Sequence, residues 1–212
     1  EGGFDEDVTL HYGQGLTGPI TVELLIGQIT ADLNFVHNTD ALNLVSLGGA
    51  ANSFGTEDIG GRLTQLNISG DAALFINGDL DDSFQDATPV TIDASALQSA
   101  GGVDLELTGS QNVTFKGSVG DDSFVVTTAD RDGGPTNDET VDITDIGGDN
   151  YYEIHGAEIV TITDGDGNSN YEIDNESGQS GYRLPAVNLV TITTGDGDNR
   201  FDAVLGSVSV SA

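Results

Sequence analysis

Residues 160–167 read Val-Thr-Ile-Thr-Asp-Gly-Asp-Gly, and residues 190–197 read Val-Thr-Ile-Thr-Thr-Gly-Asp-Gly. The two stretches repeat with an offset of 30 residues, and an aromatic residue, Tyr171 or Phe201, follows each at the same distance. The alternating β-branched residues are typical of a strand with one buried face, and the Gly-Asp-Gly run is typical of a turn. The repeated unit therefore predicts a strand, a turn and an inward aromatic side chain.

A shorter form of this unit recurs upstream. A Gly-containing polar turn followed by an aromatic residue occurs at 118–124 and 146–152, and a degenerate copy without the glycine occurs at 80–84. Repeats of this length bury their apolar side chains only against neighbouring repeats, and their aromatic residues can stack along one axis. The uneven spacing of the aromatic residues, which is 40, 28, 19 and 30 residues, indicates rungs of unequal size. The expected fold is an all-β parallel β-helix, or β-solenoid, with irregular rungs.

The repeats divide the chain into two expected parts. Residues 1–60 alternate apolar and polar residues but lack the turn unit, which favours an atypical N-terminal β segment or cap. Residues 61–212 carry the repeats and form the expected solenoid, with the largest insertion at 129–140. The best helical candidate is a single turn over 93–98, which Gly101 and Gly102 would stop.

The charge balance excludes several classes of partner. The 212 residues include 36 acidic and 5 basic ones, for a formal net charge of −31. Such a surface repels phosphate backbones and anionic lipids, so we expect no nucleic-acid binding and no membrane insertion. The chain has no cysteine, which excludes disulfides, thiolate metal sites and a cysteine nucleophile.

The acidic turns fit calcium. Calcium takes six to eight oxygen ligands in a flexible geometry, and short Asp side chains on tight turns can supply them together with backbone carbonyls. A divalent cation would also relieve repulsion that five basic residues cannot offset. Two alternatives stay open: the acids solvate their own turns, or they reflect a saline habitat. The candidate ligands are Asp121, Asp122, Asp149, Asn150, Asp164, Asp166, Asp196 and Asp198, with Asp130, Asp132 and Asp138 on the insertion.

The turns resemble the calcium-binding nonapeptide of repeats-in-toxin proteins, G-G-x-G-x-D-x-U-x. Gly120, Asp122 and Phe124 match its glycine, acid and apolar positions, and Gly197, Asn199 and Phe201 match with Asn replacing the acid. The order of the phrases at 68–74, 91–97 and 105–110 is similar to that of bacterial surface-layer proteins exported by type I secretion. The resemblance implies an extracellular, cell-surface protein that folds on calcium. The chain departs from the family because each long rung has a single motif.

No catalytic constellation is evident. The three histidines are scattered, and no nucleophile elbow, zinc-protease motif or phosphate-binding loop occurs. The carboxylate pairs Asp81–Asp82 and Asp121–Asp122 would point to opposite faces of a strand, which does not suit hydrolysis of a glycosidic bond. Polysaccharide lyases need clusters of basic residues that this chain lacks. We therefore expect a protein that is not an enzyme.

The leading hypothesis is a structural component of a calcium-dependent, self-assembling surface layer. The alternative is a stalk or repeat domain of a secreted adhesin, or an extracellular filament subunit. Self-association into a layer or filament is the expected partnership, and a cell-surface polysaccharide is the other partner considered.

Overall fold

The protein is an all-β stack of parallel strands, which confirms the predicted solenoid fold. The computed structural model describes residues 8–11, 18–36, 39–55, 63–80, 89–110, 112–128, 139–174, 189–203 and 208–211. Every regular element within these ranges is a β-strand. The described residues accordingly include no helix that could span a membrane.

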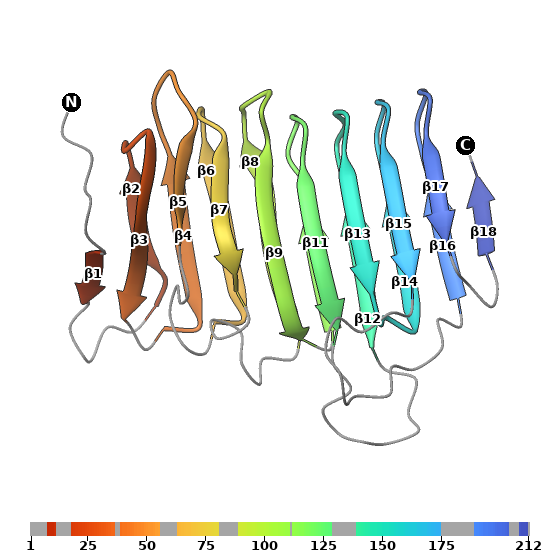
Figure 1. Cartoon of the computed structure of the whole chain (residues 1–212), viewed down its shortest axis with the longest axis horizontal. Coiled ribbons are helices and arrows are strands. Elements are labelled where there is room, and N and C mark those ends of the chain that lie inside the picture. Colours follow the sequence, from red (N-terminus) through yellow and green to blue (C-terminus); the bar gives the residue numbers. More distant parts are fainter. Residues whose placement is uncertain are drawn as a thin grey trace.

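The strands form two sheets, and consecutive strands alternate between them (Figure 1). Every strand pair is parallel. The first sheet, in spatial order, contains β1 (Val8–His11), β3 (Gln28–Val36), β5 (Asn52–Gly55), β7 (Leu74–Asp79), β9 (Val103–Ser110), β11 (Ser123–Thr128), β13 (Tyr151–His155), β15 (Asn170–Asp174) and β17 (Arg200–Ala203). The second sheet contains β2 (Ile20–Leu24), β4 (Ala41–Ser46), β6 (Gln65–Gly70), β8 (Val90–Leu97), β10 (Asn112–Lys116), β12 (Thr140–Thr144), β14 (Ile159–Thr163), β16 (Leu189–Thr193) and β18 (Val208–Ser211). We call these the odd sheet and the even sheet.

The core lies between the two sheets and follows from the alternation in the sequence. Inward residues are buried and their neighbours face outward, as in β14, where Val160 and Ile162 are fully buried. The strand register stacks equivalent residues of successive rungs into columns. One such column of the even sheet contains Leu42, Leu66, Ile92, Phe115, Ile143, Ile162 and Ile192. Each rung therefore buries its apolar side chains on the rungs beside it.

The odd sheet carries an aromatic ladder, as the repeats predict. Phe124, Tyr152, Tyr171 and Phe201 occupy equivalent positions on β11, β13, β15 and β17. Tyr152 and Tyr171 stack at 5.8 Å between ring centroids, and Tyr171 stacks on Phe201 at 4.9 Å. Phe124 stacks at 4.5 Å on Phe115 of the facing sheet. Stacked rings of this kind add attraction beyond the area that they bury.

The segment considered for a helical turn belongs to a strand, in keeping with the all-β prediction. Residues 93–98, the best helical candidate, lie mostly within strand β8, because Ile92 and Ala94 continue the buried alternation that packs this segment against its neighbours. The expected insertion at 129–140 lies almost wholly outside the described residues and stays a prediction.

The sheets run without interruption across the expected boundary at residue 60, since β4 pairs with β6 and β5 pairs with β7. The rungs before this boundary lack the Gly-Asp turn. The division into a cap and a solenoid stays a prediction.

Candidate functional site

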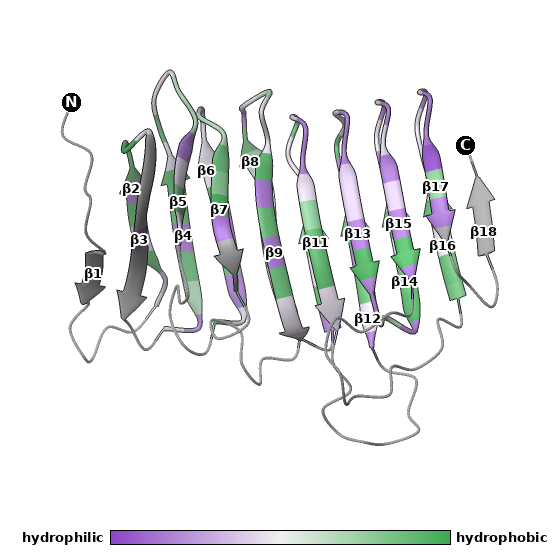
Figure 2. Ribbon diagram, in the orientation of Figure 1, coloured by the Kyte–Doolittle hydropathy of each residue, from purple (hydrophilic) through white to green (hydrophobic). Residues whose placement is uncertain are grey.

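Four consecutive turns of identical length form the most regular feature of the described chain. They connect β10 to β11, β12 to β13, β14 to β15 and β16 to β17 at one edge of the stack (Figure 1). Each turn has six residues, at 117–122, 145–150, 164–169 and 194–199. Figure 2 shows the last three turns as hydrophilic. Because the turns have the same length, residues at the same turn position lie beside one another on successive rungs.

Glycine occupies the fourth position of all four turns, as Gly120, Gly148, Gly167 and Gly197. Gly148 has φ +116°, a conformation that residues with a Cβ rarely adopt. A Cβ added to Gly148 would collide with the carbonyl oxygen of Gly120 on the preceding rung, and one added to Gly167 would collide with that of Gly148. The recurring glycine therefore permits close stacking of the turn backbones.

The fifth turn position forms an outer row of exposed Asp and Asn side chains. The backbone N–H of Asp149 donates to Oδ1 of Asp121 at 2.9 Å. Asn168 N donates to Oδ1 of Asp149 at 2.8 Å, and Asp198 N donates to Oδ1 of Asn168 at 2.9 Å. The third position repeats this geometry once, where Asp196 N donates to Oδ1 of Asp166 at 2.9 Å. Each side chain thus anchors the next rung through its Oδ1 atom.

The sixth turn position forms an inner row with the opposite hydrogen-bond direction. Asp122 N donates to Oδ1 of Asn150 at 2.9 Å, and Asn150 N donates to Oγ of Ser169 at 3.3 Å. Ser169 N then donates to Oδ1 of Asn199 at 2.9 Å. Asp122, Asn150 and Ser169 are each 2% exposed, so these bonds satisfy backbone groups that water cannot reach.

A group of buried carboxyls lies beneath the turns. Asp145 and Asp164 occupy the first turn position and are almost fully buried. Oδ2 of Asp145 accepts a short hydrogen bond from the hydroxyl of Tyr152, and Oδ2 of Asp164 accepts one from Tyr171. Burial, together with these neighbouring acids, raises the pKa of both tyrosines.

The carboxyls of Asp122 and Asp145 lie close together and affect each other's pKa. Oδ1 of Asp122 accepts hydrogen bonds from Val103 N and Ser118 Oγ, and its Oδ2 accepts one from Ser118 N. Burial raises the pKa of Asp122, and burial together with the charge of Asp122 raises the pKa of Asp145 to about 7. Protonation of Asp145 is therefore favoured at mildly acidic pH, since two neighbouring buried carboxylates disfavour double ionisation.

The structure divides the predicted calcium ligands into two groups. Asp122, Asn150 and Asp164 are buried, and their side-chain oxygens accept internal hydrogen bonds. The exposed group lies on the turn edge and contains Asp121, Asp149, Asp166, Asp196 and Asp198. Asp130, Asp132 and Asp138 lie outside the described residues.

Sequence reasoning missed Asp145 and Asn168. Both can be found by aligning the four turns over their full six residues, because Asp145 shares the first position with Asp164 and Asn168 shares the fifth with Asp121. It also missed the aromatic-column position in β9, where the register places Leu105 opposite Phe124. The degenerate copy at Phe84 lies outside the described residues.

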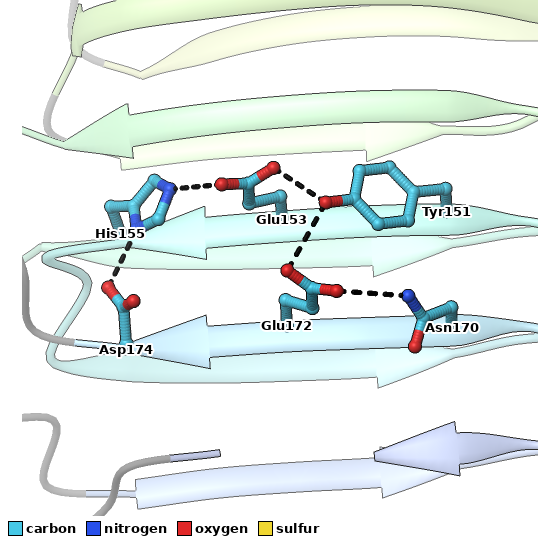
Figure 3. Close-up of polar contacts among 6 residues, drawn as sticks. All are labelled: Tyr151, Glu153, His155, Asn170, Glu172 and Asp174. Carbon is cyan, nitrogen blue, oxygen red and sulfur yellow. Dashed lines mark hydrogen bonds and ion pairs between the residues drawn. The ribbon is translucent and has the colours of Figure 1, made fainter. Parts of the chain in front are cut away.

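A second polar cluster lies on the outer face of the odd sheet (Figure 3). The ring nitrogens of His155 contact Oδ1 of Asp174 at 2.6 Å and Oε1 of Glu153 at 2.8 Å. The Tyr151 hydroxyl donates to Oε2 of Glu153 at 2.7 Å and approaches Oε2 of Glu172 at 3.3 Å. Burial alone would lower the pKa of His155, but its two carboxylate partners outweigh burial and raise it. The contacts at both nitrogens suit a protonated imidazole ring.

Within the described ranges, no three His, Asp or Glu side chains converge as a ready metal-binding group. Comparisons with protein-family models, with curated proteins and with solved structures found no match.

Proposed function

We propose that this chain is a structural element of an extracellular, self-assembling array and that calcium binds along its turn edge. The observation that carries the proposal is the outer row, in which side-chain oxygens of Asp121, Asp149, Asn168 and Asp198 repeat once per rung. The protein would act through its rigidity and repeat, with the cation holding the acidic turns together.

The outer row fits calcium better than the inner row does. Its Asp side chains are exposed, and the hydrogen bonds between rungs engage the Oδ1 atoms. Adjacent parallel strands are about 4.8 Å apart, so carboxylates at one turn position repel one another along the edge. Calcium also accepts amide and backbone carbonyl oxygens, which Asn168 and the turn glycines offer. Calcium would neutralise the row and would add ligand bonds between rungs.

A thermal melt in chelator and in millimolar calcium, at constant ionic strength, tests the calcium assignment. A cation that binds only the folded chain stabilises it by about 2.7 kcal/mol per site at a hundredfold excess over Kd. We expect calcium to raise the melting temperature by several degrees, magnesium to raise it much less, and monovalent salt to replace calcium only in part.

Charge-matched variants separate binding from simple relief of repulsion. The triple variant Asp121→Asn, Asp149→Asn, Asp198→Asn removes three charges from the turn edge, and we expect it to lose most of the calcium response. The control variant Asp104→Asn, Glu106→Gln, Asp202→Asn removes three charges from the outer face of the odd sheet and should keep the response. Equal melting temperatures of the original chain in chelator and in calcium would overturn the assignment.

The alternative, an adhesin stalk or filament subunit, predicts a different assembly. Electron microscopy of the purified chain in calcium would show sheets for a layer, fibres for a filament and isolated particles for a stalk module.

A further inference from the structure

The outer face of the even sheet has a different composition from the outer face of the odd sheet. Its outward side chains on β10, β12, β14 and β16 are mainly threonines. We call the outward side of the even sheet the threonine face. On strands β10, β12, β14 and β16 it contains Asn112, Thr114, Lys116, Thr140, Asp142, Thr144, Ile159, Thr161, Thr163, Leu189, Thr191 and Thr193.

Charge is scarce on this face, although the chain has a net charge of −31. On the described even-numbered strands β2 to β16, the outward residues include three carboxylates, those of Glu23, Asp93 and Asp142. Lys116 pairs with Asp93 at 2.8 Å. The odd sheet, by contrast, has outward carboxylates on β9, β13, β15 and β17, namely Asp104, Glu106, Glu153, Glu172, Asp174 and Asp202. Two copies of the chain would therefore repel least when their threonine faces meet.

Polar side chains on the threonine face already bond to one another. Nδ2 of Asn43 donates to Thr21 Oγ1 at 3.1 Å, and Nδ2 of Asn67 donates to Asn43 Oδ1 at 2.8 Å. Thr140 Oγ1 donates to Asn112 Oδ1 at 2.9 Å. Covering groups that are already paired costs less than covering unpaired ones. These paired groups can therefore lose contact with water at a small polar cost.

The face also offers exposed apolar surface. Leu189, which is 44% exposed, lies beside Ile159 on the adjacent strand, and the threonine methyl groups extend this surface along the strands. The even sheet has nine strands about 4.8 Å apart, and a strand of five residues is about 16 Å long. The face of this sheet therefore has an area of roughly 700 Å² per copy. That area approaches the roughly 800 Å² per partner of a standard stable interface.

We propose that the threonine face is the interface between two copies of this chain, packed sheet against sheet. The proposal rests on the self-assembling function proposed above and specifies the surface that would carry it. Sheets pack face to face about 10 Å apart when their side chains interdigitate, which small β-branched residues allow. The acidic odd sheet would then face solvent.

Matched single substitutions test the interface by sedimentation velocity of the full chain in millimolar calcium. Thr191→Asp places a charge on the threonine face, where the strand neighbours at that register are Thr161 and Ser209. Thr127→Asp places the same charge on the odd sheet at a similarly half-buried position. We expect Thr191→Asp to weaken association at least tenfold, Thr127→Asp to leave it unchanged, and Thr191→Val to preserve it. Circular dichroism of each variant establishes that it folds.

The outcomes distinguish this proposal from the broader one. If the original chain associates and both Asp variants associate equally well, the threonine face is not the interface, while the self-assembling function stands. If the original chain is monomeric at every concentration, both proposals are overturned. If a monomeric chain instead binds insoluble polysaccharide and Thr191→Asp abolishes that binding, the occupant is a glycan and the proposed interface between copies is wrong.

Discussion

The N-terminal and C-terminal rungs close their turns by different means. Near the N-terminus a single buried side chain, Asn52, joins its own rung to the preceding one: the two N–H bonds of its Nδ2 are shared among Leu24 O, Ser46 Oγ and Leu47 O. Its Oδ1 accepts from the backbone N–H groups of the turn at 25–27. The C-terminal turns instead repeat one hydrogen bond per rung along the outer and inner rows.

The N-terminal rungs thus concentrate their turn hydrogen bonds on one side chain, and the C-terminal rungs distribute them over many. Five partner groups lie within hydrogen-bond distance of the Asn52 amide, so the turns of these two rungs depend on one residue. In the C-terminal turns each rung anchors the next, so the same turn can be extended by repetition. The C-terminal turns also concentrate acids, so we expect those rungs to respond to pH and, as proposed above, to calcium.

The largest expected effect tests this difference directly. Asn52→Ala would leave several buried backbone and side-chain groups unpaired and should lower the free energy of unfolding by about 4 kcal/mol. Asn168→Ala removes one exposed acceptor from the outer row and should cost less than about 1 kcal/mol. Urea denaturation of the two variants measures their free energies of unfolding. Equal losses of stability would show that Asn52 is no more important to its turns than Asn168 is to the outer row.

An intermediate effect concerns the buried acids of the C-terminal rungs. The pKa of Asp145 is about 7 in the folded chain against an ordinary value of 3.8, so the folded state holds more protons between those values. Stability should therefore fall as the pH rises from about 4 to about 7. Asp145→Asn removes this titration and should flatten that fall, raising the free energy of unfolding at pH 8 by on the order of a few kcal/mol.

Thermal melts of the original chain and the Asp145→Asn variant across this pH range provide the measurement. Asp104→Asn, at an exposed position on β9, is the control and should leave the shape of the profile unchanged. An unaltered profile in the Asp145→Asn variant would show that the titration of Asp145 does not govern the pH dependence of stability.

The smallest expected effect concerns His155 on the outer face of the odd sheet. Its pKa is raised by Asp174 and Glu153, so its stabilisation is complete below its ordinary value of 6.5 and is lost as the pH rises through the folded value. His155→Gln should cost about 1 kcal/mol or less at pH 6 and nearly nothing at pH 9. Nuclear magnetic resonance titration of the imidazole ring measures the pKa directly, and a value at or below 6.5 would contradict the contact geometry.

Much of the fold was predictable because it depends on local repetition. The alternation at 160–163 and 190–193 determines which side chains face the core, and the glycine before each aromatic residue marks a tight turn. The rung containing β8 and β9 was harder to find, since its turn at 98–102 lacks the Gly-Asp unit and Leu105 replaces the aromatic residue. The strand pairing of the structure identifies this rung, because β8 lies between β6 and β10 and β9 lies between β7 and β11.

The candidate site was only partly predictable, and Asp121 and Asp122 show why. The two residues are adjacent and chemically identical, yet Asp121 is exposed in the outer row and Asp122 is buried among Val103, Ser118 and Asp145. Sequence alone identified both as oxygen donors on a turn. Their different surroundings arise from rungs that are distant in sequence.

Strand alternation, turn glycines and charge are local properties, so the all-β solenoid, the turn edge and its acidity follow directly from the sequence. The register of the rungs adds which acids are buried together, which anchor the next rung, and which of the two faces has few charges. Those distinctions depend on the register of parallel strands, which brings together residues 19 to 30 positions apart. The pKa of a carboxyl depends on its burial and on the neighbouring groups, and this register determines both.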